Sequence, residues 1–182
     1  MWGGQTSTQI AARFFAEPDL FGDFALIWAG RNNYGERITV ESDIASMVSS
    51  LTTPNYLILG VINGNYPSEY KGHNWGYLTM TGLNSDLAAT YGSRFIDMRT
   101  ILVNSYNPSS SQDLIDFSHD VVPSSLRTDR VHLNAAGYAI VAQTVYTAYT
   151  SVTAVPLPSA IWLFGTGLGL LSFTRRKKSQ NR

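Results

Sequence analysis

The sequence predicts one α/β domain followed by a distinct C-terminal segment. Two apolar runs of strand length, residues 24–27 and 56–62, have the composition of buried strands in a parallel sheet. Between them, Ile44, Met47 and Val48 keep the spacing of one helical face. Because strands that alternate with helices favour a parallel sheet with helices packed on it, we expect that architecture over residues 1–149.

The other predicted elements continue this alternation. Thr6 and Gln9 have the spacing of a capping box, which predicts a helix that carries Ile10, Phe14 and Phe15. The pattern further predicts a helix over residues 78–91, a strand over 94–98, a loop over 104–111, a helix over 135–149 and a linker over 147–153.

A loop rich in Gly, Asn, Tyr and Pro is predicted over residues 63–75, at the carboxyl end of the second strand. Ligand sites of α/β proteins lie at such ends, so this loop is a candidate wall of a substrate pocket. Aromatic residues in and beside it are candidates for stacking on a sugar ring, or for ordinary packing: Tyr66, Tyr70, Trp75 and Tyr77.

The segment Asp129-Arg130-Val131-His132-Leu133-Asn134 places a carboxylate three residues before an imidazole, just ahead of a helix. An Asp that accepts a hydrogen bond from one ring nitrogen of a His leaves the other nitrogen free to act as a general base. The alternative is structural: Asp129 closes a turn, His132 is a loop residue and Asn134 is the N-cap of the helix.

Two further groups are candidates for stabilising an oxyanion. Asn32 follows the first predicted strand in Gly30-Arg31-Asn32-Asn33, where its amide can donate to a developing negative charge. Gly4 lies in Gly3-Gly4-Gln5, before the predicted capping box, where a glycine can present its N–H to an anion. Each segment alone is also compatible with a plain turn.

Taken in order, Gly4, Gly30-x-Asn32 and Asp129-x-x-His132-Leu133-Asn134 resemble the SGNH (GDSL-type) serine hydrolase family. The resemblance implies a three-layer αβα, flavodoxin-like fold. It also implies that Gly4 and Asn32 are oxyanion donors, that His132 is the general base and that Asp129 orients it. It implies an ester substrate and no metal ion or cofactor.

This sequence departs from the family in two places. Asn33 stands where the third block usually has Asp, which leaves Asn32 in place but changes its surroundings. The first block, Gly-Asp-Ser at the end of the first strand, is absent, and so is the nucleophile that it carries. None of the candidate replacements lies in a glycine-flanked strand-to-helix turn: Ser7, Ser118, Ser124 and Ser125.

We therefore expect a partial domain that lacks its first strand and is inactive as given, with a truncated start more probable than a natural pseudoenzyme. The family's first strand is central, so its loss predicts an open hydrophobic edge on the strand at residues 24–28 and poor solubility. Met1 to Gly4 contain neither a basic nor an apolar signal-peptide region, which is consistent with the same missing segment.

The C-terminal segment has three parts. Val-Pro-Leu-Pro at residues 155–158 ends a predicted linker (150–158), a charge-free run (159–174) follows, and Arg175-Arg176-Lys177-Lys178 opens a basic tail (175–182). The layout resembles the PEP-CTERM sorting signal, with Leu157 where Glu is usual, and implies processing by an exosortase. An ordinary membrane anchor is the alternative. Either predicts an exported domain, a transmembrane helix at 159–174 and a cytoplasmic basic tail.

The composition of the chain argues against some classes of partner and of catalytic nucleophile. Of the 13 basic residues five follow Pro158, leaving eight against 13 acids in the body of the chain, which argues against a nucleic-acid partner. The absence of cysteine excludes a thiol nucleophile. The predicted function is an exported esterase or acylhydrolase, with acylated polysaccharide as one substrate class. The alternatives are a non-catalytic, surface-anchored binding protein and, more remotely, a metal site built from His119, Asp120, Asp129 and His132.

Overall fold

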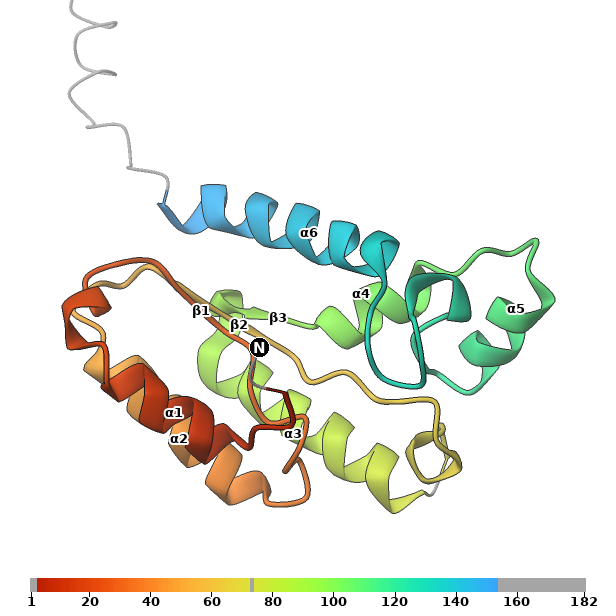
Figure 1. The fold of residues 1–182 in the computed structure, drawn as a ribbon, viewed down its shortest axis with the longest axis horizontal. Helices are drawn as coiled ribbons and strands as arrows, with labels where there is room; N and C mark the ends of the chain where they lie inside the picture. Colours follow the sequence, from red (N-terminus) through yellow and green to blue (C-terminus); the bar gives the residue numbers. More distant parts are fainter. Residues whose placement is uncertain (1–2, 73, 154–182) are drawn as a thin grey trace, which may run out of the picture. The chain divides into compact units, whose positions relative to one another are not determined.

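The computed structural model describes residues 3–72 and 74–153, in which three parallel strands lie between two layers of helices (Figure 1). The strands are β1 (Ala25–Ile27), β2 (Tyr56–Leu59) and β3 (Phe95–Ile96), in the order β1-β2-β3. The α-helices are α1 (Ser7–Phe15), α2 (Arg37–Ser50), α3 (Trp75–Tyr91), α4 (Met98–Asn104), α5 (Ser111–Ser118) and α6 (Ala135–Thr153).

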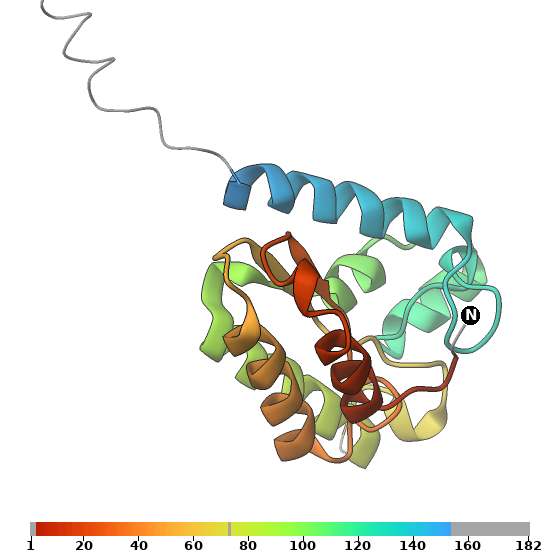
Figure 2. The same ribbon diagram turned by 60° about the vertical axis from the view of Figure 1, so that its left-hand side comes forward.

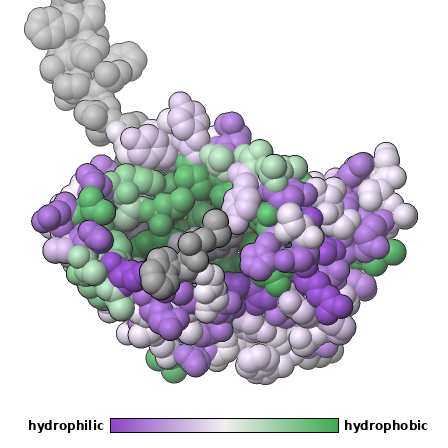
Figure 3. Space-filling view, viewed as in Figure 1, coloured by the Kyte–Doolittle hydropathy of each residue, from purple (hydrophilic) through white to green (hydrophobic). Residues whose placement is uncertain are grey.

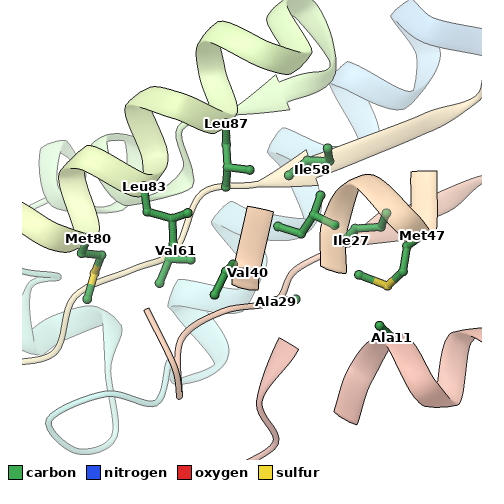
Figure 4. Packing of buried hydrophobic residues seen from close by; sticks show 11 residues of the cluster. Ala11, Ile27, Ala29, Val40, Met47, Ile58, Val61, Met80, Leu83 and Leu87 are labelled. Atoms are coloured by element: carbon green, nitrogen blue, oxygen red, sulfur yellow. The ribbon is translucent and has the colours of Figure 1, made fainter. Parts of the chain in front are cut away.

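Alternation along β2 explains the two layers. Ile58 belongs to a core cluster with residues of α1, α2 and α3, including Ala11, Met47 and Leu83 (Figure 4). Its neighbours Leu57 and Leu59 belong to a second cluster with residues of α4 and α6. Because successive side chains of a strand point to opposite faces, each face of the sheet acquires its own helical layer. Both ribbon views show α6 on the other side of the sheet from α1 and α2 (Figures 1 and 2).

The predicted α/β class and parallel sheet are confirmed, although each strand is shorter than its apolar run. The capping box is also confirmed: the Thr6 side chain accepts from the Gln9 N–H, and the Gln9 side chain accepts from the Thr6 N–H. Two short helices were missed. Asp97 caps α4 by accepting from Thr100 N–H, and Ser110 caps α5 by accepting from Asp113 N–H.

The predicted linker at residues 147–153 is wrong, because α6 continues to Thr153. The cause is packing: Ala148 and Val152 are partly buried against the cluster that contains Leu57. The predicted span at 159–174 and the basic tail lie outside the described residues. Of the helices that are described, none has both the length and the apolar character needed to cross a bilayer.

Strand β1 has an open edge within the described part of the chain, as the sequence predicted. It pairs with β2 alone, in a register that places Leu26 opposite Leu57. Leu57 is 0% exposed, whereas Leu26 is 45% exposed. A groove of about 510 Å³ lies beside this strand, and its apolar lining residues include Leu26 of β1, Phe14 of α1, and Leu20 and Phe24 from the segment between α1 and β1. Figure 3 shows hydrophobic residues gathered in a hollow beside α6 on this side of the molecule.

Candidate active site

A cleft of about 560 Å³ lies where β1 and β2 end. Its wall includes Ala29 and Asn32 after β1, Ile62 and Tyr66 after β2, and His132 from the loop before α6. Carboxyl ends of parallel strands are the usual place for the site of an α/β protein. Gly4 also lines this cleft, so the structure brings Gly4, Asn32 and His132 together from three distant parts of the sequence.

Gly4 adopts a φ of 74°, a left-handed conformation that glycine takes without strain. It comes just before Gln5, whose carbonyl oxygen accepts a hydrogen bond of 2.8 Å from Asn32 Nδ2. Because Gln5 follows Gly4 directly, this bond keeps the two predicted oxyanion donors, Gly4 and Asn32, close to each other. An amide nitrogen carries two hydrogens, so Asn32 keeps a second N–H for a ligand.

Asn33 explains how these donors are held. Its side chain is buried, accepts from the Ser7 N–H at 2.9 Å and donates to Ser7 Oγ at 3.0 Å. An ionised Asp, which is usual in the family at this place, would accept but could not donate. Asn33 therefore fastens the start of α1 to the segment that carries Asn32.

Ser7, considered above as a replacement nucleophile, is the first residue of α1 and joins this helix to α2. Thr6 caps α1, whereas the buried Ser7 hydroxyl donates to Asp43 Oδ2 at 2.6 Å while it accepts from Asn33. The hydroxyl thus joins α1 to α2. Ser7 does not line the cleft. The described residues that do line it include no Ser or Thr.

Asp129 and His132 form the predicted pair. Asp129 Oδ2 lies 2.8 Å from His132 Nδ1, and Asp129 Oδ1 accepts from the backbone N–H groups of His132 and Val131. Those two backbone bonds, of which the His132 bond is the stronger cause, and the imidazole contact hold the pKa of Asp129 well below its usual range. An ionised carboxylate only accepts, so Nδ1 carries the proton and Nε2 is left free as a base.

This pair is exposed, but the loop that carries it rests on buried groups. The carboxylate of Asp116 is completely buried and accepts from Arg127 Nη2 at 2.9 Å. The same guanidinium donates through Nη1 to the Asp129 carbonyl oxygen at 3.0 Å. Thr128 N–H donates to the His132 carbonyl at 2.8 Å and closes the turn. Arg127 therefore couples the buried carboxylate to the backbone of the Asp129 turn.

Asp113 supports the preceding part of this loop. It is 0% exposed and accepts from Ser124 Oγ, from both the N–H and Oγ of Ser125, and from Asn107 N–H. Burial alone would raise the pKa of Asp113, but these hydrogen bonds outweigh it and lower the pKa below its ordinary value. Ser124 and Ser125, considered as replacement nucleophiles, are thus occupied in holding this carboxylate.

Asn134 is the cap of α6, as the structural alternative predicted. Its Oδ1 accepts from Gly137 N–H at 3.0 Å, and its Nδ2 donates to the Ser125 carbonyl at 2.8 Å. The cap therefore fastens the start of α6 to Ser125, which itself donates to the buried Asp113. Asp113 and the residues that donate to it (Asn107, Ser124 and Ser125) are called the Asp113 cluster below.

The residues of the metal-site alternative are not assembled. His119 stacks on Tyr70, with ring centroids 4.0 Å apart, while Asp120 pairs with Arg99 at 3.0 Å and accepts from Tyr77 OH at 2.6 Å. Across the described residues, no three His, Cys, Asp or Glu side chains form a group able to hold a metal ion. The metal-site hypothesis is wrong for these four residues because His119 and Asp120 are engaged in packing and ion pairing.

Of the loop aromatics named from the sequence, Tyr66 lines the cleft. Tyr70 and Tyr77 are engaged as described above, and Trp75 is exposed beside Tyr34, with ring centroids 5.9 Å apart. Sequence reasoning did not identify Arg31, Tyr34 and Tyr138 as lining residues, although all three contribute to the wall. Arg31 adjoins Asn32 in sequence, which is the signal that would have found it.

Comparison with known proteins supports the fold. No family model matches the chain, and no curated protein matches it by sequence. Among solved structures, the chain is similar to a candidate acylhydrolase from Bacteroides fragilis, with 19% sequence identity and a TM-score of 0.60. The match covers 82% of this chain and 72% of that one. The mixed α/β architecture is therefore shared with a protein described as an acylhydrolase.

Proposed function

We propose that this chain is most of an SGNH-type ester hydrolase, an esterase or acylhydrolase, and that it lacks the nucleophile as given. The observation that carries the proposal is the common cleft of Gly4, Asn32 and His132, with Asp129 bonded to His132 Nδ1. These residues have the order that the family resemblance implies, and the structural similarity to a candidate acylhydrolase supports the same class.

The proposed chemistry assigns one step to each group. A serine on a strand outside these 182 residues attacks the ester carbonyl, and His132 Nε2 takes its proton. The N–H of Gly4 and the remaining N–H of Asn32 donate to the oxyanion. The alcohol leaves with the proton from His132, and water activated by His132 then releases the acid from the serine. Asp129 keeps the imidazole in one tautomer throughout.

Two features of the structure support a nucleophile that comes from outside the chain. The residues that line the described cleft include no Ser, Thr or Cys. The edge of β1 is open, and the apolar groove beside it is of a kind that another strand covers. A chain without the nucleophile has no covalent route, so the proposal includes inactivity of the 182 residues alone.

Export, membrane anchoring by residues 159–174 and exosortase processing are proposed from the sequence of the tail alone. The substrate class proposed with them is an acyl ester of a polysaccharide outside the cytoplasm.

The test is to read the DNA upstream of the Met1 codon in frame and to express the extended chain without residues 154–182. We expect an encoded strand that ends in Gly-Asp-Ser, and hydrolysis of p-nitrophenyl acetate that requires this serine and His132. Asn32→Ala should lower kcat by about 100-fold, the usual cost of one oxyanion donor. His119→Ala is the matched control, because His119 is a histidine outside the cleft, and it should keep full activity.

A stop codon directly upstream, together with no hydrolysis, would contradict the enzyme and leave the alternative, a surface-anchored binding protein that retains the fold. Activity that survives His132→Ala would contradict the assigned base.

A further inference from the structure

Two guanidinium groups lie against tyrosines that line the cleft, although one of the two, Arg130, is not itself a lining residue. Arg31 lines the cleft, and its Cζ is 5.4 Å from the ring centroid of Tyr34. The Cζ of Arg130 is 5.6 Å from the ring centroid of Tyr66. Both tyrosines line the cleft. Because Asn65 N–H donates to the Arg130 carbonyl at 2.7 Å, the Tyr66 loop and the His132 loop are held together here.

The guanidinium of Arg31 has N–H donors that its ion-pair partner, Glu69, does not use. Its Nη2 donates to Glu69 Oε1 at 3.0 Å, whereas its Nε is buried and has no partner within the described chain. Glu69 is itself well supplied, since it also accepts from Gly64 N–H at 2.6 Å and Tyr34 OH at 3.2 Å. The Arg31 side chain is 23% exposed and lines the cleft, so an acceptor on a ligand can reach it from there, while the buried Nε shows that Glu69 leaves a donor unused.

The charge of the cleft differs from that of the domain around it. The body of the chain has 13 acids against eight bases, yet no Asp or Glu lines the cleft in the part that the structure describes. Two carboxylates lie next to lining residues, and both have partners: Glu69 forms an ion pair with Arg31, and Asp129 is hydrogen-bonded to His132. An anion that enters the cleft thus meets Arg31, which is paired with Glu69, and faces no unpaired carboxylate of the described wall. The exposed Arg130 lies against the wall residue Tyr66.

We propose that Arg31 and Arg130 bind a carboxylate on the substrate, so that the preferred substrate is an acyl ester of an acidic sugar, such as an O-acetylated uronic acid unit. Tyr34 and Tyr66 contact the sugar ring, while the acyl carbonyl lies near Asn32 and His132. This inference rests on the proposed ester hydrolase function and specifies its substrate. A purely structural Arg31, present only to pair with Glu69, would give no preference for acidic over neutral ligands.

Binding can be measured on the 182-residue chain, because the proposal includes no turnover there. The probes are an O-acetylated oligogalacturonide and the same oligosaccharide with its carboxyl groups reduced. Dissociation constants come from calorimetry, and the site comes from NMR shifts of the Asn32 side-chain amide and the Gly4 N–H. We expect the acidic probe to bind at least about tenfold more tightly, with the advantage shrinking as salt is raised.

Variants assign this preference to the two arginines. Arg130→Gln alters an exposed side chain and should reduce the preference without affecting folding, whereas Arg31→Gln should abolish it. Arg31→Lys keeps a cation beside Glu69 and is the second variant if Arg31→Gln does not fold. Arg13→Gln, on exposed α1 surface outside the cleft, is the matched control and should change nothing.

Equal dissociation constants for the two probes, or an acidic preference that survives in both the Arg130 and the Arg31 variants, would overturn the inference. Failure of the acidic probe to shift the Asn32 and Gly4 signals would also overturn it. Each of these results is distinguishable from failure of the proposed function, which is decided by p-nitrophenyl acetate hydrolysis in the extended chain.

Discussion

The cleft at the carboxyl ends of β1 and β2 and the groove beside β1 adjoin each other, since Trp28 lines both. They differ in that polar side chains of the cleft have hydrogen-bond partners, whereas an apolar side chain of the groove stays exposed. In the cleft, Asn32, Asp129 and His132 each have a hydrogen-bond partner, and buried carboxylates support the loop behind them. In the groove, Leu26 leaves 45% of its surface exposed opposite the fully buried Leu57.

The described chain therefore holds the groups of the cleft by itself, whereas it leaves the edge of β1 uncovered. Hydrogen bonds between residues of the described chain hold His132, the proposed base, and Asn32, a proposed oxyanion donor. Among the described residues, no strand pairs with the open edge of β1 and Leu26 stays 45% exposed. A further strand or a covering segment would remove these groups from water. Figure 3 shows this edge as a hydrophobic hollow. The comparison therefore predicts a preformed cleft next to an incomplete sheet.

The largest expected effect comes from breaking the support of the cleft. Asp113→Ala removes the acceptor of four hydrogen bonds in a buried place, which should lower the free energy of unfolding by about 3–5 kcal/mol. Asp97→Ala, which removes the exposed cap of α4, is the control and should cost about 1 kcal/mol. Urea unfolding measures both; equal costs would contradict the role of the Asp113 cluster.

The same carboxylate gives a dependence on pH. Because the pKa of Asp113 is lower in the folded chain than its ordinary value, its ionised form stabilises the fold above the unfolded pKa of about 3.9. This contribution should be lost as the pH falls through the folded pKa. The Asp113→Ala chain should therefore lose less stability than the parent on acidification below pH of about 4.

The two register partners on β1 and β2 test the incomplete sheet. Leu57→Ala should cost about 3 kcal/mol, as for a fully buried leucine, while Leu26→Ala should cost under about 1 kcal/mol. In a chain extended by the proposed upstream strand, the cost of Leu26→Ala should rise toward that of Leu57→Ala. If the Leu26 cost stays unchanged in the extended chain, the added segment does not cover the groove.

A smaller effect is expected where α6 meets the cleft loop. Gly137 is buried, and a Cβ there would overlap the carbonyl oxygen of Leu126. Alanine normally stabilises a helix over glycine by up to about 1 kcal/mol, but here the overlap should make Gly137→Ala destabilising by about 1–3 kcal/mol. Gly22→Ala, which meets only Thr52 Oγ1 at 3.5 Å, is the matched control. A stabilised Gly137→Ala chain would contradict the close contact.

Local patterns were sufficient to predict much of this fold. Two apolar runs predicted β1 and β2, a strand was also predicted over residues 94–98, where β3 lies, and the Thr6–Gln9 spacing predicted the start of α1. The extent of α6 was not predictable from residues 147–153, which are mostly polar or β-branched. This part of α6 packs through Ala148 and Val152 on residues that are distant in the sequence. Helices α4 and α5 are too short to show a clear period.

For the site, the sequence identified Gly4, Asn32, Asp129 and His132, which the structure places in or beside one cleft. Their catalytic roles stay predictions. The buried acids Asp113 and Asp116 and the cleft residue Arg31 were missed, since nothing local separates a buried carboxylate from the other acids of the chain. Burial and pairing of such groups depend on contacts between segments far apart in the sequence.

The most direct test of the central claim is covalent labelling with a fluorophosphonate, which reacts with an activated serine, followed by intact-mass measurement. We predict that the 182-residue chain gains no phosphonyl group, and that the extended chain gains one on the serine of its added strand only when His132 is present. Labelling of the 182-residue chain on one of its own serines, or an unlabelled extended chain, would contradict the account.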